Sequence, residues 1–230
     1  MPESISVAVG PGHVTAMAYA PPEDKARAVA TVILGHGAGA SQSSDFMVAF
    51  ARGLARRGCH AVTFNFPYTE AGRRLPDRPA TLEGCVRAVI AAVRTRASLA
   101  AAPLVIGGKS MGGRIASQVA AAGVADLAAL VFLGYPLHPP GKPEQLRSAH
   151  LPRIRQPMLF VQGSRDAFGT PDELRAVLDP LGASAHLHVV EGGDHSFAVP
   201  RRGPVTQPQV FERVQDDIVA WLETVLATGA

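Results

Sequence analysis

The sequence predicts an α/β protein with a mostly parallel, eight-stranded sheet flanked by helices on both faces. Short apolar runs rich in β-branched residues alternate with longer helical patterns along the chain. Glycine-rich turns follow several of these runs, as is typical where a strand passes into a helix. The chain has 230 residues, of which 47% are hydrophobic, so it is long enough to bury a core without disulfides or a structural metal. We expect one domain over residues 1–230.

The expected elements follow the chain in order. Eight short runs are expected to be strands: Ile5–Val9, Val14–Tyr19, Ala30–Leu34, His60–Phe64, Leu104–Ile106, Ala129–Leu133, Met158–Gln162 and His186–Val190. The first two flank Gly10-Pro11-Gly12, which predicts an antiparallel hairpin at one edge. Helices are expected near residues 44–57, 81–96, 111–122, 171–179 and 208–227. Thr170 and Glu173 form a capping box that marks the start of the fourth helix.

Composition excludes several classes of protein. No apolar run reaches the roughly 18 residues of a membrane span, and the first segment, MPESISVAVGPGH, lacks the basic and apolar regions of a secretory signal. Cys59 and Cys85 form no CxxC motif and are interpreted as reduced, buried thiols. The net charge is +3, but the basic residues are scattered and only 6% of residues are aromatic. We therefore expect a cytoplasmic protein with no nucleic-acid or membrane partner.

The stretch LVIGGKSMGGRIA carries the strongest motif. A strand runs into G-x-S-x-G, formed by Gly108, Ser110 and Gly112, and a helix follows. This pattern is typical of a nucleophile elbow, in which a tight turn exposes the serine hydroxyl at the N-terminal end of a helix. The helix dipole and the free N–H of Met111 favour negative charge there. The motif predicts that Ser110 is a nucleophile.

Two nucleotide-binding interpretations compete with the elbow. Gly108-Lys109-Ser110 contains the GKS of a phosphate-binding loop, but that motif needs a glycine where Pro103 stands. The segment from Gly35 to Ala40 matches a relaxed dinucleotide pattern, but the next strand ends at Asn65-Phe66 instead of an acidic residue. The sequence therefore predicts no nucleotide cofactor and no metal.

The segment HGAGA has a better explanation as part of an oxyanion hole. Acyl transfer needs a second backbone N–H aimed at the developing negative charge, and a glycine-rich loop after an early strand supplies one. Gly37 or Ala38 is the expected donor, together with Met111. His36 is expected to hold this loop in place.

A serine nucleophile needs a base and an acid, in the chain order serine, acid, histidine. Of the eight histidines, only His195 lies in a loop just after the last strand, within EGGDHSF. Asp166 follows the seventh strand in VQGSRD and is the expected acid. Asp172 suits the first turn of its helix, and Asp194 is adjacent to the histidine in sequence, so both are poorer candidates. The sequence predicts a triad of Ser110, His195 and Asp166.

The motifs GGKSMGG, HGAGA and GGDHSF together resemble the α/β-hydrolase superfamily over essentially the whole chain. The stretch FNFPYTEAGRRLPD followed by GGKSMGGR is similar to a smaller branch related to the dienelactone hydrolases. That branch includes a testis-expressed hydrolase-like protein and a chromatin-complex subunit with a hydrolase-like domain. Dienelactone hydrolases carry a cysteine nucleophile, whereas this chain has Ser110 at that place. The sequence assigns no role to Lys109.

These residues predict a serine hydrolase that cleaves a carboxylic ester, or a related acyl bond, of a small-molecule substrate through an acyl-enzyme intermediate. Residues 135–157 are too few for a large cap domain and allow one helix, near Lys142–Ala149. The site is therefore expected to be open and rimmed by Phe66, Tyr68 and Tyr135. A thioesterase, an amidase or an acyltransferase uses the same triad, and a non-catalytic binding or assembly protein uses the same fold. We expect a monomer or a homodimer.

Overall fold

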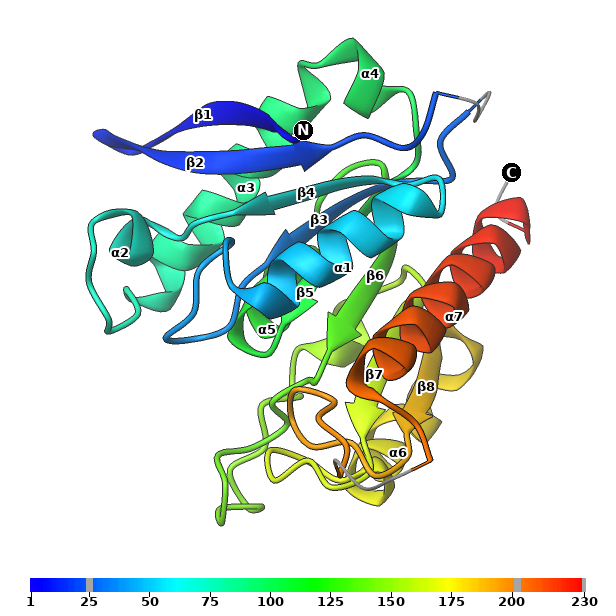
Figure 1. Cartoon of the computed structure of the whole chain (residues 1–230). Helices are drawn as coiled ribbons and strands as arrows, with labels where there is room; N and C mark the ends of the chain where they lie inside the picture. The colour runs from blue at the N-terminus through cyan, green and yellow to red at the C-terminus, as the bar shows by residue number, and fades with distance from the viewer. Residues whose placement is uncertain (24–26, 201–203, 229–230) are drawn as a thin grey trace.

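A single eight-stranded sheet organises the chain. A computed structural model describes residues 1–23, 27–200 and 204–228 (Figure 1). The strand order is β1-β2-β4-β3-β5-β6-β7-β8. The strand bounds are β1 Glu3–Val9, β2 Gly12–Tyr19, β3 Thr31–Gly35, β4 His60–Phe64, β5 Leu104–Lys109, β6 Leu127–Leu133, β7 Met158–Gly163 and β8 Ala185–Val190. Strand β2 runs antiparallel to both of its neighbours, and every other pairing is parallel. The expected fold class and the edge hairpin are confirmed.

Helices cover both faces of the sheet. Their bounds are α1 Asp45–Arg56, α2 Pro67–Glu70, α3 Pro79–Arg94, α4 Ala97–Ala100, α5 Met111–Ala121, α6 Pro171–Leu178 and α7 Gln207–Thr228. Helices α1 and α7 lie on the near face in Figure 1, and α3, α5 and α6 lie behind the sheet. Both faces are therefore shielded from water, which explains why the central strands are mostly apolar and buried along nearly their whole length.

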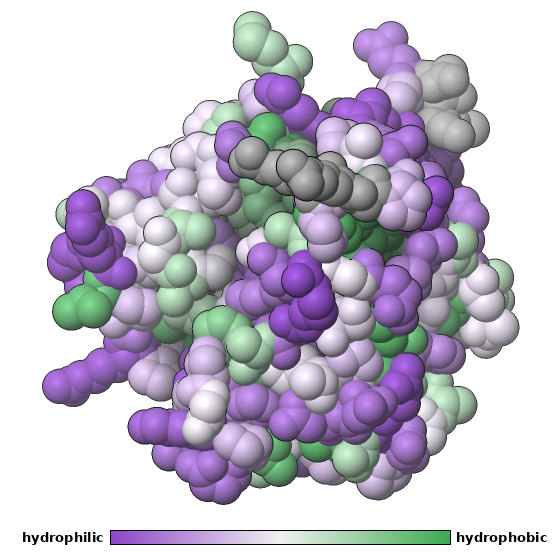
Figure 2. Space-filling model, turned by 60° about the horizontal axis from the view of Figure 1, so that its bottom comes forward, coloured by the Kyte–Doolittle hydropathy of each residue, from purple (hydrophilic) through white to green (hydrophobic). Residues whose placement is uncertain are grey.

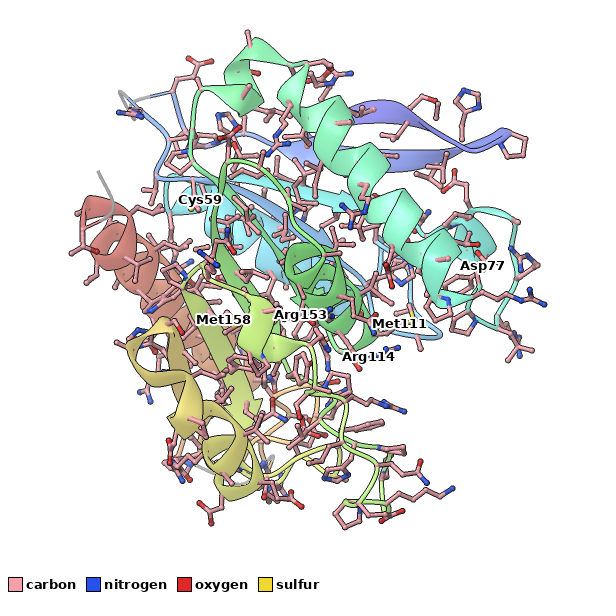
Figure 3. The ribbon with its side chains drawn as sticks, turned by 180° about the vertical axis from the view of Figure 1, so that it is seen from behind. Cys59, Asp77, Met111, Arg114, Arg153 and Met158 are labelled. Carbon is pink, nitrogen blue, oxygen red and sulfur yellow. The ribbon has the colours of Figure 1, made fainter. Side chains whose placement is uncertain are left out.

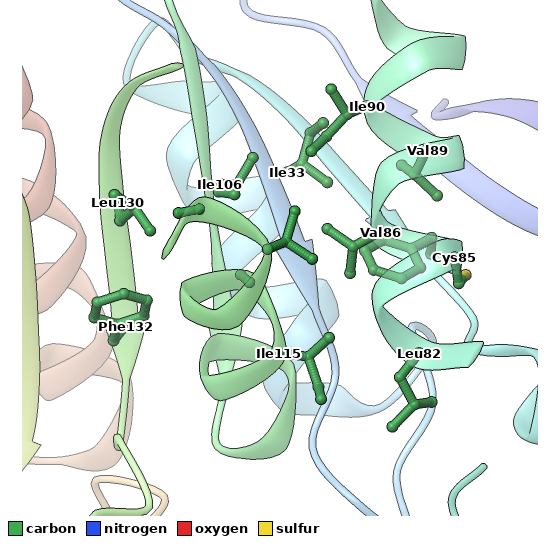
Figure 4. Packing of buried hydrophobic residues seen from close by; sticks show 14 of the residues in the cluster. Ile33, Leu82, Cys85, Val86, Val89, Ile90, Ile106, Ile115, Leu130 and Phe132 are labelled. Atoms are coloured by element: carbon green, nitrogen blue, oxygen red, sulfur yellow. The ribbon is translucent and has the colours of Figure 1, made fainter. Parts of the chain in front are cut away.

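Two hydrophobic cores result, one on each face. In the core behind the sheet, Val86 and Ile90 of α3 pack with Ile115 of α5 over Ile33 and Ile106 (Figure 4). Each such side chain stabilises the fold by about 1.5–3 kcal/mol when it leaves water. The cysteines are separated by this architecture, because Cys85 lies in the α3–α5 core and Cys59 in the core under α1 and α7. Both thiols are free and buried, as expected.

The segment after β6 differs from expectation. The helix expected near Lys142–Ala149 does not form, and turns and irregular backbone take its place. Pro139 and Pro143 lack the backbone N–H that a helix needs, and Gly141 has φ +72°. The short 3₁₀ helix Leu151–Arg153 is the only helical turn between β6 and β7 in the described chain. No separate cap domain is present in the parts of the chain that the structure describes.

Several short elements escaped sequence analysis. These are α2, α4 and the 3₁₀ helices Leu151–Arg153 and Asp179–Ser184, each too short to show a periodic pattern. The expected capping box at Thr170 and Glu173 is present, since Thr170 Oγ1 accepts from the Glu173 N–H and the Glu173 carboxylate accepts from the Thr170 N–H. None of the described helices combines the length and apolarity needed to span a membrane.

Candidate active site

Ser110 occupies a strained turn between β5 and α5. Its backbone has φ +51° and ψ −117°, a conformation that is rare for a residue with a side chain. Strand β3 passes so close to the turn that a Cβ on Gly108 or Gly112 would lie 2.2 or 2.1 Å from the carbonyl oxygen of Gly35. The two flanking glycines of the elbow motif are therefore required sterically. They let the serine project beyond the carboxyl edge of the sheet.

His195 reaches the same edge from the loop after β8. Its Nε2 lies 2.8 Å from Ser110 Oγ, and its Nδ1 lies 2.7 Å from Asp166 Oδ2. The carboxylate accepts from Nδ1–H, so the lone pair of Nε2 faces the serine hydroxyl. The structure brings together the three residues that the sequence singled out, in the order serine, histidine, aspartate.

A hydrogen-bond network holds Asp166 and uses both of its carboxylate oxygens as acceptors. It is 1% exposed; Oδ1 accepts from the Phe168 N–H at 2.8 Å, and Oδ2 also accepts from Gln162 Nε2 at 2.8 Å. Gln162 is itself fixed, because its Oε1 accepts from the Tyr135 N–H and its Nε2 donates to the Gly169 carbonyl. A buried carboxylate needs such partners, since burial of an unsatisfied charge is costly. The network orients Asp166 towards His195.

The loop that carries His195 is attached to the loop after β7. Asp194 Oδ1 accepts from the backbone N–H groups of Ser196 and Ala198, at 2.8 and 2.9 Å, and so closes the loop on itself. Arg165 donates through Nε to the Gly192 carbonyl at 2.8 Å. Asp194 thus shapes the loop and does not contact the imidazole, as expected from its place next to His195 in the sequence.

Lys109 forms an additional tie between the nucleophile and the histidine loop. The side chain is 7% exposed, and its Nζ donates to the backbone carbonyl of His195 at 2.5 Å. The ring of Phe46 lies 5.6 Å from the ammonium. Burial lowers the pKa of Lys109 to about 8, although the carboxylates of Asp166 and Asp194 oppose this shift. Lys109 therefore connects β5 to the loop that carries His195.

The loop after β3 approaches Ser110 from the other side. A Cβ on Gly37 would lie 3.5 Å from Ser110 Cβ, and Gly37, Ala38 and Met111 all line the cavity at the serine. His36 fixes this loop: its Nδ1–H donates to the Gly37 carbonyl, and its Nε2 accepts from the Phe66 N–H. Burial lowers the pKa of His36, which keeps it neutral and suited to this pair of bonds. The expected structural role of His36 is confirmed.

A cavity of about 670 Å³ opens at the triad. The ring of Phe168 packs on His195 with 4.2 Å between the ring centroids and forms part of the wall. Further lining residues come from four segments: Phe46 and Met47 of α1, Pro76, Asp77 and Leu82 near α3, Arg114 of α5, and Pro136 and Arg147 after β6. The carboxyl edge of the sheet is turned towards the reader in Figure 2, where the surface is mostly hydrophilic and apolar patches are small and scattered.

The three aromatic residues expected at the rim lie elsewhere. Phe66 and Tyr135 are 0% exposed, Tyr68 is 1% exposed, and none of them lines the cavity at Ser110. Phe66 and Tyr68 pack around His36, and the Tyr135 hydroxyl donates to the carbonyl of Arg147 at 2.9 Å. The expectation of an aromatic rim is therefore wrong, because the turns after β4 and β6 direct these rings into the core.

Other residues near the triad were missed by sequence analysis. Gln162 was identified only as the last residue of a strand, although a polar residue within the apolar run MLFVQG signals a buried hydrogen-bonding role. Arg114 lies within the stretch GGKSMGGR, but the elbow pattern assigns no role to that position, and Phe168 and Arg147 lie in stretches without a recognisable motif. Among the described residues, no group of three or more histidines, cysteines or acids is arranged to hold a metal ion.

The fold and the site define the class of protein. An eight-stranded, mostly parallel sheet with a serine elbow after β5, an aspartate after β7 and a histidine after β8 is the arrangement of the α/β hydrolases. A sequence model of the alpha/beta hydrolase domain family matches residues 28–223. The chain therefore belongs to the α/β-hydrolase family.

Solved structures share this fold over nearly the full chain. An α/β serine hydrolase without lid from Xanthomonas campestris has a TM-score of 0.72 and 21% identity, covering 99% of this chain and 94% of that chain. A dienelactone hydrolase from Anabaena variabilis has a TM-score of 0.75 and 20% identity, covering 97% of each chain. Est1E from Butyrivibrio proteoclasticus, solved with ferulic acid bound, has a TM-score of 0.77 and 14% identity, covering 97% of this chain and 99% of that chain. At these identities the likeness is one of fold.

Proposed function

We propose that this protein is a serine hydrolase that cleaves a carboxylic ester of a small-molecule substrate. The observation that carries the proposal is the continuous hydrogen-bond chain from Ser110 Oγ through His195 to Asp166, at 2.8 and 2.7 Å. A serine in a strained turn, next to a base that is itself oriented by a carboxylate, has the geometry of an activated nucleophile. The chain is proposed to act as one domain, as a monomer or homodimer, and without a cofactor.

The first half of the reaction forms the acyl enzyme. Ser110 Oγ attacks the ester carbonyl carbon while His195 Nε2 takes the hydroxyl proton. The N–H groups of Met111 and Ala38, with Gly37 as an alternative to Ala38, donate to the oxyanion that develops on the carbonyl oxygen. His195 then gives its proton to the leaving alcohol as the carbon–oxygen bond breaks.

The second half releases the acid. Water enters the cavity, gives its proton to His195 Nε2 and attacks the acyl carbon, and the serine regains its proton when the carboxylic acid leaves. Asp166 stabilises the imidazolium in both halves and keeps Nδ1 protonated, so that Nε2 remains the reactive nitrogen. Gln162 supports this role because it holds Asp166 Oδ2 at 2.8 Å.

An open cavity favours small, water-soluble esters over long lipids. The segment between β6 and β7 contributes loop and one 3₁₀ turn within the described residues, so little protein lies over the serine. Thioesters and amides pass through the same acyl enzyme and are the neighbouring candidates. A binding or assembly role for the fold is the alternative of a different class.

Loss of the nucleophile tests the proposal most directly. Ser110→Ala is expected to lower kcat for short p-nitrophenyl esters at least about 1,000-fold, because the acyl enzyme can no longer form. A fluorophosphonate probe is expected to label the unmodified protein at Ser110 and to leave the variant unlabelled. The exposed Ser98 offers a matched control, since Ser98→Ala removes the same atom far from the site.

Two results contradict the proposal. Ester turnover that is unchanged in Ser110→Ala would remove the serine from the mechanism. A native protein that forms no adduct at Ser110 favours the binding or assembly role instead.

A further inference from the structure

Two arginines line the cavity beside Ser110 and have no partner for their charge in the described parts of the chain. Arg114 lies on α5, one turn after Ser110, and Arg147 lies in the loop after β6. Neither guanidinium makes a hydrogen bond or an ion pair within residues 1–23, 27–200 and 204–228. The Nε of Arg114 is buried without any hydrogen-bond partner. Figure 3 shows Arg114 beside Met111 at the same end of α5.

The surroundings of these arginines are mostly positive. Burial and the charge of Arg147 lower the pKa of Arg114, while Tyr135 and Glu83 oppose this shift from beyond ion-pair distance. Burial, together with the charges of Arg153 and Arg114, holds the pKa of His150 at about 4, so His150 is neutral near pH 7. A half-buried, unpaired pair of like charges costs free energy in the unliganded protein.

One carboxylate lines the same cavity. Asp77 Oδ1 accepts from Arg73 at 2.7 Å, whereas Asp77 Oδ2 is buried without a hydrogen-bond partner among the described residues. Arg73 lies outside the cavity lining. Lys109 also lines the cavity, but its ammonium is used by the His195 carbonyl. Among the charged residues that line the cavity, Arg114 and Arg147 are therefore the cations whose guanidinium groups are available to bind a ligand.

The backbone of the Arg147 loop is held in place. The Tyr135 hydroxyl donates to the Arg147 carbonyl at 2.9 Å, and the Arg147 N–H donates to the Leu137 carbonyl at 2.8 Å. Burial raises the pKa of Tyr135 to about 12, so its hydroxyl stays protonated and remains a donor. Arg114 is held by its helix, since its N–H donates to the Ser110 carbonyl at 3.1 Å. Both arginines are thus presented to the cavity from fixed backbone.

We propose that Arg114 and Arg147 form a subsite for an anionic group of the substrate, so that the ester cleaved at Ser110 carries a second, negatively charged group, a carboxylate or a phosphate. This inference rests on the proposed ester hydrolysis, because the subsite is one wall of the same cavity. Guanidinium groups bind both anions through paired, charge-assisted hydrogen bonds. One helical turn rises about 5.4 Å, which places the anion a few bonds from the reacting carbonyl.

Ligand binding to the inactive Ser110→Ala protein tests the subsite without requiring turnover. Calorimetry compares monomethyl glutarate, which carries a carboxylate, with neutral dimethyl glutarate and with inorganic phosphate. One anion is expected to bind about 10- to 100-fold more tightly than the neutral diester, as charge-assisted hydrogen bonds predict. Adding Arg114→Gln or Arg147→Gln is expected to remove that difference. Adding Arg52→Gln, at an exposed helical arginine without an ion pair among the described residues, is expected to preserve it.

The identity of the tighter anion assigns the subsite to a carboxylate or to a phosphate. Equal binding of both anions and the neutral diester to Ser110→Ala, or anion binding that is unaffected by both arginine variants, would overturn the proposal.

Turnover by the active protein separates this inference from the proposed function. The ratio of kcat/KM for monomethyl over dimethyl glutarate is expected to exceed about 10 in the native protein and to fall towards one in Arg114→Gln, mainly through KM. Hydrolysis of both esters at equal rates, with no change of ratio in Arg114→Gln, overturns the anion subsite and leaves the hydrolase intact. Anion binding to Ser110→Ala without turnover or Ser110 labelling in the native protein overturns the hydrolase and leaves the subsite.

Discussion

Two walls of the cavity differ in whether their charged side chains have protein partners: the histidine wall, with Asp166 and Lys109, and the arginine wall, with Arg114 and Arg147. On the histidine side, Asp166 and Lys109 are buried and each has protein partners: Asp166 accepts from His195, Gln162 and Phe168, and Lys109 donates to the His195 carbonyl. On the α5 side, Arg114 and Arg147 have backbone that is fixed and guanidinium groups that have no partner in the described chain. The charged groups of the first wall thus have protein partners, whereas the guanidinium groups of the second have none among the described residues.

Under the proposed function, this difference separates groups that position the reaction from groups that select the substrate. A satisfied buried charge is rigid, and rigidity keeps a general base within reach of its serine. A partly buried charge without a partner contributes most to the free energy of ligand binding, because the ligand offsets the desolvation cost that the folded protein already carries. Variants on the histidine wall are therefore expected to change kcat, and variants on the arginine wall to change KM and substrate preference.

The largest effect is expected on the histidine wall. Asp166→Asn keeps the shape of the side chain but presents an amide to His195, which disfavours the tautomer with a proton on Nδ1. In a triad this lowers kcat about 10,000-fold. Steady-state kinetics with a short p-nitrophenyl ester measures the effect, and Asp172→Asn, at an exposed position of α6, is the matched control. A fall of less than tenfold would show that Asp166 does not orient the base.

Lys109→Met is expected to have an intermediate effect on kcat and a separate effect on stability. Removal of the ammonium frees the His195 carbonyl, so the base is held less well, and a loss of about tenfold or more in kcat is expected. The folded-state pKa of Lys109, about 8, is below the unfolded value of 10.5, so the unfolded chain binds the proton more tightly. The native protein should therefore gain up to about 3 kcal/mol of stability relative to Lys109→Met as the pH rises from 8 to 10.5.

Urea unfolding at a series of pH values measures the difference between the two proteins. The exposed Lys142 provides the control, because Lys142→Met should leave the pH dependence of the native protein unchanged. Stability curves for Lys109→Met and the native protein that stay parallel between pH 7.5 and 10 would contradict the buried charge.

The smallest effect is expected at Tyr135, a buried residue behind the arginine wall. Tyr135→Phe removes the hydroxyl that donates to the Arg147 carbonyl, which should cost about 1 kcal/mol of stability. The preference for the anionic ester should fall by less than in Arg147→Gln, because the guanidinium remains. Tyr19→Phe is the control, since the hydroxyl of Tyr19 has no hydrogen bond among the described residues. An unchanged preference would uncouple Tyr135 from the arginine wall.

The strands, the main helices and the triad could be predicted from the sequence, whereas the side chains that line the cavity could not. The strands and main helices follow from hydrophobic periodicity, and the proximity of Ser110, Asp166 and His195 follows from chain order, because parallel strands bring their carboxyl ends to one edge. The positions of Phe66, Tyr68 and Tyr135 were wrong because periodicity does not reveal which way a side chain points within a turn. Lys109 received no role because its partner, the His195 carbonyl, lies 86 residues away in the sequence.

The placement of the two cysteines keeps them from forming a disulfide with each other. The thiols of Cys59 and Cys85 lie on opposite faces of the sheet, so the strands between them prevent a disulfide. Burial raises their pKa values to about 11 and 12, so the reactive thiolate is scarce near neutral pH. A reductant therefore finds no disulfide between these cysteines to reduce, and an oxidant finds no solvent-accessible thiolate. The native structure therefore depends neither on forming nor on breaking a disulfide between these two cysteines.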